Sequence, residues 1–165
     1  MANSYSEIPS PDIGQLKNPT VQLSASELDA KRLNIWLVED VNADAVFTKT
    51  VLEATGVPFD FTCIERGDSL ISRLKVTQPD SPPDIIFLDM GLPGMDGFEI
   101  LTEMLRLPVF VRSIPIVILT GHSYFEDVST TYPLNIVDYI VKFPDTERLK
   151  NILQRIRHPV ANHIG

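Results

Sequence analysis

Three acidic residues follow apolar runs of the chain and could form a site for chemistry. Glu39 and Asp40 come directly after the run 35–38, and Asp89 comes directly after the run 85–88. Carboxylates held close together repel one another and resist ionisation until a cation joins them. Such hard oxygen ligands suit Mg²⁺, or Mn²⁺ in its place. A carboxylate that also contacts such an ion is a plausible nucleophile toward a phosphoryl donor, which would give an aspartyl phosphate.

A hydroxyl and an ammonium group follow two later apolar runs in the same way. Thr120 comes after the run 116–119, and Lys142 comes after the run 136–141. Phosphoryl transfer depends mainly on positioning and on neutralisation of charge. Thr120 and Lys142 could supply both, provided that the fold brings the ends of these runs together.

Apolar, strand-like runs alternate with amphipathic segments five times along the chain. The runs are 35–38, 59–65, 85–88, 116–119 and 136–141. Near-continuous apolar strands are typical of a sheet buried on both faces, and their alternation with helices predicts a parallel sheet. We therefore expect an α/β fold, a (βα)5 doubly wound five-stranded sheet with strand order 2-1-3-4-5. Ligands of such sheets bind at the carboxyl ends of the strands, where the candidate side chains would converge.

The segments between the runs carry helix signals. Asn42 is expected to cap the first helix and Gly56 to end it. The apolar face predicted for this helix consists of Ala43, Phe47, Val51 and Ala54. The other expected faces are Leu70, Ile71 and Leu74; Phe98, Leu101, Met104 and Leu105; and Leu149, Ile152, Leu153 and Ile156. Ser123 and Glu126 form a capping box for one more helix, and Cys63 is expected to be buried in its apolar strand.

Composition and charge exclude several classes of protein. The chain has 14 basic and 22 acidic residues, so its net charge of −8 argues against nucleic acid or a membrane surface as partner. A single cysteine excludes an internal disulfide framework. No apolar run approaches the roughly 20 residues of a membrane span, and the start lacks signal-peptide features, so a cytoplasmic protein is expected. We expect a flexible N-terminal arm (1–30), one domain (31–157) and a loose C-terminal tail (158–165).

Taken together, these motifs resemble the receiver domain of two-component response regulators. The likeness is carried by Leu37-Val38-Glu39-Asp40, by the run DMGLPGMDG at 89–97, and by Thr120 and Lys142. It covers residues 33–157 and implies the flavodoxin-like receiver fold. Because no helix-turn-helix follows the receiver, the chain is expected to be a stand-alone regulator like the chemotaxis regulator. A fainter likeness is to regulators paired with bacterial phytochrome kinases.

The resemblance implies a role for each matched acidic residue. Asp89 would be the phosphoacceptor, with a sensor histidine kinase, a phosphotransfer protein or acetyl phosphate as donor. Asp40 and Asp89 would bind Mg²⁺ or Mn²⁺ together with the backbone carbonyl of Gly91, and Glu39 would act directly or through water. Such a chain would be a phosphorylated signalling protein and not an enzyme acting on a separate substrate.

The resemblance also implies a conformational switch. Thr120 would hydrogen-bond the phosphoryl group, Lys142 would pair with it, and Tyr139 would be the aromatic residue that turns inward. The readout face, which could also form a homodimer, would comprise the helix after Ser123, the strand 136–141 and the last helix. Gly91 and His122 stand at the positions that tune dephosphorylation in the family.

Besides Gly91 and His122 at the dephosphorylation positions, the chain departs from the family pattern at two places. Glu39 stands where aspartate is commoner, and the order Lys142-Phe143-Pro144 places proline one residue late, which leaves the geometry of this loop open. A phosphorylation-independent interaction module is therefore an alternative function. A flavodoxin-like enzyme is disfavoured because no phosphate-binding loop follows the first run. The G-x-x-G-x-x-G spacing from Gly91 to Gly97 indicates a turn, since a dinucleotide fingerprint is spaced differently.

Overall fold

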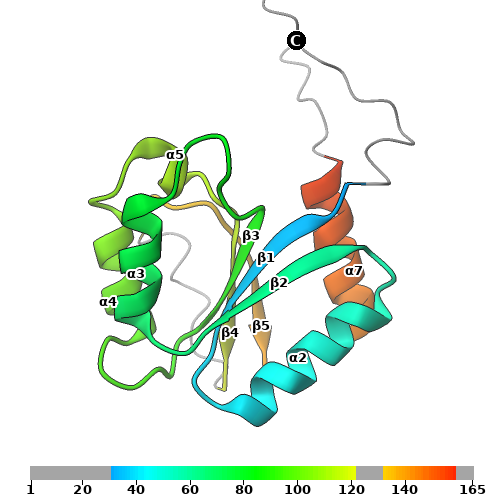
Figure 1. The fold of residues 1–165 in the computed structure, drawn as a ribbon. Coiled ribbons are helices and arrows are strands. Elements are labelled where there is room, and N and C mark those ends of the chain that lie inside the picture. The colour runs from blue at the N-terminus through cyan, green and yellow to red at the C-terminus, as the bar shows by residue number, and fades with distance from the viewer. Residues whose placement is uncertain (1–30, 122–131, 159–165) are drawn as a thin grey trace, which may run out of the picture.

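The computed structural model describes residues 31–121 and 132–158, which form a parallel sheet with helices on both faces. The strands are β1 (Leu33–Val38), β2 (Phe59–Ile64), β3 (Ile85–Asp89), β4 (Ile116–Thr120) and β5 (Ile136–Val141). Their order in the sheet is β2-β1-β3-β4-β5 (Figure 1). The predicted fold class and strand order are therefore confirmed.

The described helices divide between the two faces of this sheet. They are α2 (Asn42–Ala54), α3 (Gly67–Val76), α4 (Gly97–Met104), α5 (Val109–Arg112) and α7 (Thr146–Arg157). Figure 1 shows α2 and α7 on one face and α3, α4 and α5 on the other. The helix expected after Ser123, His122, the arm 1–30 and the tail beyond His158 lie outside the described residues.

The core consists of two apolar clusters that share the central strands. Ile85 and Phe87 of β3 face the cluster under α2 and α7, whereas Ile86 and Leu88 face the cluster under α3 and α4. All residues of β3 and β4 are buried. Burial on both faces explains why these two strands are continuous apolar runs with no polar alternation. The last residue of each strand, Asp89 or Thr120, is therefore a polar group at the edge of a rigid core.

Helix α2 is rotated relative to the sequence prediction. Its buried residues are Ala45, Thr48 and Leu52, whereas Ala43 and Phe47 are exposed. Asn42 is the first helical residue and not the cap, because Val41 holds the cap position without a side-chain hydrogen bond. Gly56 ends the helix as predicted, with a φ of 72° that favours glycine. The predicted face was right for Val51, which packs against the core, and wrong for its other members. Phe47 packs against Phe143 at the surface and not against the sheet.

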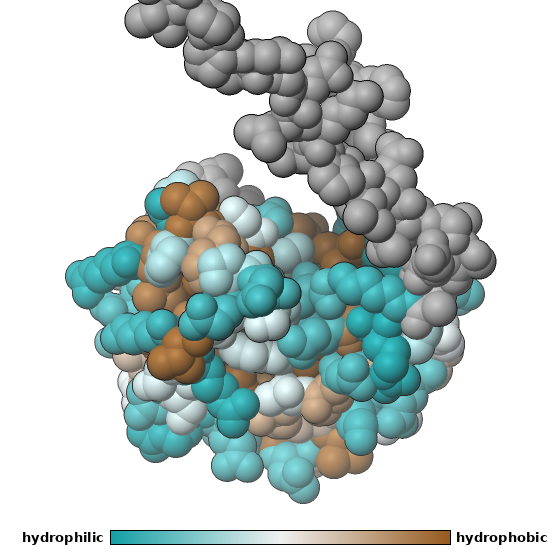
Figure 2. All heavy atoms as spheres, turned by 45° about the horizontal axis from the view of Figure 1, so that its top comes forward, coloured by the Kyte–Doolittle hydropathy of each residue, from teal (hydrophilic) through white to brown (hydrophobic). Residues whose placement is uncertain are grey.

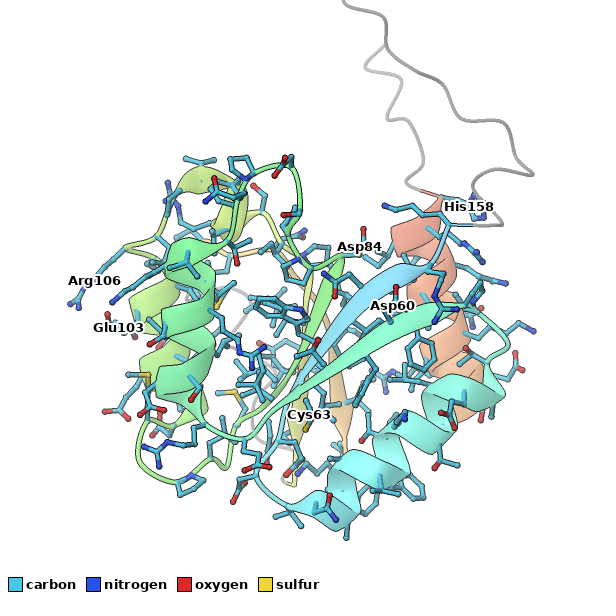
Figure 3. The ribbon with its side chains drawn as sticks, viewed as in Figure 1. Asp60, Cys63, Asp84, Glu103, Arg106 and His158 are labelled. Carbon is cyan, nitrogen blue, oxygen red and sulfur yellow. The ribbon has the colours of Figure 1, made fainter. Side chains whose placement is uncertain are left out.

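Two other apolar residues are more exposed than expected. Cys63 is exposed on β2, which is an edge strand and has less cover than the central strands (Figure 3). Phe98 on α4 is also exposed, and Ile100, Leu101 and Met104 form the buried face of that helix.

Hydrophilic residues cover most of the face seen in Figure 2. In residues 31–121 and 132–158 the structure contains no helix long and apolar enough to span a membrane.

The segment between β3 and α4 folds back over the carboxyl end of the sheet. Gly94 turns the chain with a φ of 79°, which confirms the turn that the glycine spacing predicts. Asp96 then begins α4 with a capping box, since its side chain accepts from the Glu99 backbone and the Glu99 side chain accepts from the Asp96 backbone. Gly97 packs so closely on Met90 that a Cβ would lie 2.4 Å from the Met90 Sδ. These contacts fix the loop that follows Asp89.

Candidate phosphoacceptor and cation site

The predicted carboxylates meet at the carboxyl ends of β1 and β3. Glu39 follows β1 and is 1% exposed, and Asp89 ends β3 and is 5% exposed. Asp40 lies beside them and is exposed to solvent. One carboxylate oxygen from each of the three residues lies within 4.8 Å of the other two. The topology of the sheet thus brings together residues that are far apart in the sequence.

Lys142 reaches this cluster from the end of β5. Its Nζ donates to Glu39 Oε2 at 2.7 Å, to Asp89 Oδ2 at 2.9 Å and to Asp44 Oδ2 at 3.0 Å. The peptide bond between Lys142 and Phe143 is cis, although residue 143 is not proline. Because Lys142 makes these three hydrogen bonds, the late proline does not prevent the lysine from reaching the acidic cluster. All three protons of the ammonium group have carboxylate acceptors.

Burial and charge shift the pKa values of two groups in this cluster. Burial raises the pKa of Glu39 above its ordinary value, and this effect outweighs the hydrogen bonds from Lys142 and from the Val41 backbone. Burial alone would lower the pKa of Lys142, but its hydrogen bonds to Glu39, Asp89 and Asp44 raise that pKa well above its ordinary value. Lys142 is therefore a fixed positive charge, whereas Glu39 takes up a proton more readily than a free glutamate.

Backbone amides orient the two buried carboxylates. The Gly91 N–H donates to Asp89 Oδ1 at 3.1 Å, and the Val41 N–H donates to Glu39 Oε1 at 3.1 Å. A Cβ at residue 91 would lie 3.7 Å from Asp89 Oδ1, so the glycine leaves the space beside this carboxylate free. Asp89 thus has one oxygen held by the backbone and the other held by Lys142.

Asp89 lines an open cavity together with residues from β4 and β5. The cavity has a volume of about 340 Å³, and Asp44, Gly91, Thr120 and Lys142 also contribute to its wall. Thr120 is 3% exposed at the end of β4, and its backbone carbonyl accepts from the Lys142 N–H at 2.8 Å. A small anionic group could enter this cavity and reach Asp89, Thr120 and Lys142 together.

Tyr139 does not line this cavity. It is partly buried in β5 and packs against the apolar cluster under α3 and α4. His122, the second residue expected to tune dephosphorylation, lies outside the described residues. The structure therefore brings together Glu39, Asp40, Asp89, Gly91, Thr120 and Lys142 and leaves Tyr139 at a distance along the strand.

One charged residue of the site, Asp44, was not predicted from the sequence. Asp44 lies in the first turn of α2, and its carboxylate contacts Lys142. The available signal was its position four residues after Asp40, near the start of the helix that follows the acidic pair. That signal is weak, because acidic residues are common in the first turn of any helix.

The donor set fits a small divalent cation. An ion such as Mg²⁺ binds oxygen ligands at about 2.0–2.1 Å, so its ligand oxygens lie roughly 3–4 Å apart. The separation of up to 4.8 Å between the oxygens of Glu39, Asp40 and Asp89 requires only a small inward movement. Three carboxylates without nitrogen or sulfur ligands also match the preference of Mg²⁺ and Mn²⁺ for oxygen.

The doubly wound sheet carries a carboxylate cluster and a lysine at its carboxyl end, as the sequence motifs predict. The chain belongs to the response regulator receiver domain family, whose model matches residues 35–154. Members of this family are signalling proteins of two-component systems and not classical enzymes. The resemblance given by the sequence motifs is therefore confirmed.

Several response regulators resemble the chain in sequence and structure. The response regulator Rcp1 of Synechocystis sp. is 32% identical over 125 residues, which is 74% of this chain and 84% of that protein. The structure of the phosphorylated cyanobacterial phytochrome response regulator RcpA is 30% identical with a TM-score of 0.59, over 78% of this chain and 93% of that chain. The Mn²⁺-bound form of Rcp1 is 29% identical with a TM-score of 0.56, over 81% and 97% of the two chains.

Proposed function

We propose that this chain accepts a phosphoryl group on Asp89 from a sensor histidine kinase or a phosphotransfer protein. The observation that carries the proposal is the contact of Lys142 Nζ with both Asp89 and Glu39 inside the cleft. A lysine in this place holds positive charge where a phosphoryl group would add negative charge. Asp89, the nucleophile of this proposal, and Lys142 line one open cavity at the end of the sheet, which supports the proposal.

In the proposed step, one carboxylate oxygen of Asp89 attacks the phosphorus atom of the donor. The new O–P bond forms as the P–N bond of a phosphohistidine breaks, and the bonding electron pair stays on the imidazole. With acetyl phosphate the P–O bond breaks, and acetate leaves. Asp89 needs no base for this step, because a carboxylate is already the attacking form.

Glu39, Asp40, Asp89 and the backbone carbonyl of Gly91 would hold a divalent cation, Mg²⁺ or Mn²⁺. When bound, such an ion supplies positive charge that offsets repulsion between the carboxylates and the incoming phosphoryl oxygens. Glu39 would contribute directly or through water. Glutamate has one more methylene than the aspartate that is commoner at this position. The Glu39 carboxylate nevertheless faces the cluster, because it is buried and hydrogen-bonded to Lys142.

Thr120 and Lys142 would respond to phosphorylation of Asp89. The Thr120 hydroxyl would donate to a phosphoryl oxygen, and the Lys142 ammonium would pair with the same group. Because the Lys142 N–H donates to the Thr120 carbonyl, a shift at β4 reaches β5 directly. Tyr139 lies on β5, so we propose it as the switch residue. We propose the face of β5 and α7, together with the helix expected after Ser123, as the readout and homodimer surface.

An apolar rim beside the cleft suits a protein donor. Phe47 on α2 and Phe143 after β5 contact each other with ring centroids 4.7 Å apart and ring planes tilted by 57°, and both are about half exposed. Val41 and Val46 are also exposed near the start of α2. Exposed aromatic pairs of this kind are typical of interaction surfaces. We propose that the protein donor docks on this rim, and the likeness to phytochrome response regulators favours a phytochrome-type kinase as that donor.

The experiment that tests the function is incubation with acetyl phosphate, with and without Mg²⁺, followed by intact-protein mass spectrometry. We expect one added phosphoryl mass in the presence of Mg²⁺, little in EDTA, and none on Asp89→Asn. Unmodified wild-type protein under all conditions would favour the phosphorylation-independent interaction module. Asp80→Asn, which removes an exposed carboxylate in the loop before β3, is the control and should be modified like wild type.

A further inference from the structure

Asp44 contacts the lysine of the site but does not belong to the group of carboxylates that could hold a cation. Its Oδ2 lies 3.0 Å from Lys142 Nζ, and its side chain is 24% exposed. Within the part of the chain that the structure describes, the group of carboxylates with one oxygen each within 4.8 Å of the others consists of Glu39, Asp40 and Asp89. Among the described residues, Asp44 is thus the one carboxylate that binds Lys142 from outside the candidate cation group.

The three acceptors of Lys142 would therefore behave differently when the cation and the phosphoryl group bind. Glu39 and Asp89 are the acceptors that a cation would engage, and Asp89 is also the residue that the phosphoryl group would esterify. Both bonds to the lysine therefore change when the site is loaded. The bond to Asp44 needs no such change, because Asp44 takes part in neither event.

We propose that Asp44 is a positioning residue that keeps the Lys142 ammonium in the cleft when Glu39 and Asp89 engage the cation and the phosphoryl group. This inference rests on the proposed function of the site. Lys142 has a long side chain with several rotatable bonds, and holding it in one geometry costs conformational entropy. A carboxylate on the rigid first turn of α2 removes most of that freedom before the phosphoryl group arrives.

A purely structural role would be a favourable charge at the start of α2. Acidic side chains in the first turn stabilise a helix through its dipole, whatever else they contact. Asp68 offers a matched comparison, because it lies in the first turn of α3 and pairs with Arg66 outside the cleft. Substitution of either residue should have similar consequences for helix stability, but only substitution of Asp44 should affect the loaded site.

The test measures binding of beryllofluoride, a phosphoryl mimic, to the full chain by calorimetry at saturating Mg²⁺. We expect Asp44→Ala to weaken beryllofluoride binding by roughly tenfold or more, the factor that one charge-assisted hydrogen bond typically contributes. Asp44→Asn keeps an acceptor oxygen at the same place and should lose less of the affinity for beryllofluoride. Asp68→Ala should bind beryllofluoride like wild type. In parallel, ¹⁵N NMR should show a protected Lys142 ammonium in the loaded wild type and not in Asp44→Ala.

Each outcome of this experiment decides for or against the inference. Beryllofluoride affinities of Asp44→Ala and wild type that agree within about twofold would overturn it, as would an equal loss in Asp68→Ala. Thermal unfolding of each variant shows whether it is folded. If Asp44→Ala does not fold, the comparison is made with the isosteric Asp44→Asn. Failure of the proposed function gives a different result, because wild type itself would then bind no beryllofluoride, and both proposals would fall.

Discussion

Asp40 is the residue whose removal should change stability and cation binding in opposite directions. Its exposed carboxylate adds a negative charge to a cluster in which Glu39, Asp89 and Asp44 already share one lysine. Repulsion between like charges at this distance near the surface costs about 1 kcal/mol or less. We therefore expect Asp40→Asn to raise the free energy of unfolding in EDTA by up to about 1 kcal/mol, measured by urea titration.

The same variant should lose the stabilisation that Mg²⁺ provides. Wild type should gain roughly 2.7 kcal/mol when free Mg²⁺ reaches 100 times its dissociation constant, because the ion binds the folded state. Asp40→Asn should gain much less at the same concentration, and the control Asp80→Asn should respond like wild type. An equal response to Mg²⁺ in Asp40→Asn and wild type would contradict the placement of the cation.

The raised pKa of Glu39 predicts how the free energy of unfolding depends on pH. Burial raises the pKa of Glu39 above 4.5, so the folded state holds its proton more tightly than the unfolded state. The free energy of unfolding therefore falls as pH rises from about 4.5 through the folded-state pKa. Glu39→Gln lacks this loss, so its free energy of unfolding relative to wild type should increase as pH rises above about 4.5.

Lys142 does not disturb this comparison, because its pKa lies far above the range and it stays charged throughout. The measurement is a series of urea titrations in EDTA at several pH values, performed on Glu39→Gln and wild type together. A difference that is constant with pH, or that shrinks as pH rises, would show that Glu39 ionises as freely as in water.

At the scale of the secondary structure elements, the rotation of α2 determines which of its apolar residues pack in the core. Leu52 is completely buried against the sheet, whereas Phe47 is 44% exposed. Leu52→Ala should lower the free energy of unfolding by about 2–4 kcal/mol, since it leaves a cavity. Phe47→Ala should cost less than about 1 kcal/mol, because it removes only a surface ring contact. Similar losses in the two variants, measured by urea titration, would contradict the observed rotation of α2.

The same helix shows where sequence-based prediction reaches its limit. The apolar runs predicted a parallel sheet, for which the order 2-1-3-4-5 was expected and is observed. They also predicted where Glu39, Asp89, Thr120 and Lys142 meet, because strand ends in a parallel sheet share one edge. The rotation of α2 could not be inferred, since its apolar residues lie on more than one side of the helix. That rotation decides whether Asp44 faces the cleft, so the residue could not be recognised from the sequence.

At the scale of the whole molecule, the site combines a rigid centre with a charged entrance. Asp89 ends a strand that is buried along its whole length, so its position depends on both apolar clusters of the core. The net charge of −8 makes the approach of an anionic donor unfavourable. Lys142 and a bound cation would offset that charge locally, which is why the account depends on both groups being present at Asp89.

Direct mapping of the phosphorylated residue tests the central claim. Wild-type protein treated with acetyl phosphate and Mg²⁺ is reduced with borohydride, which converts an aspartyl phosphate to homoserine, and is then digested for peptide mass spectrometry. We predict homoserine at residue 89 and at no other aspartate, with the signal absent when Mg²⁺ is omitted. Homoserine at a different aspartate, with Asp89 unchanged, would contradict the account.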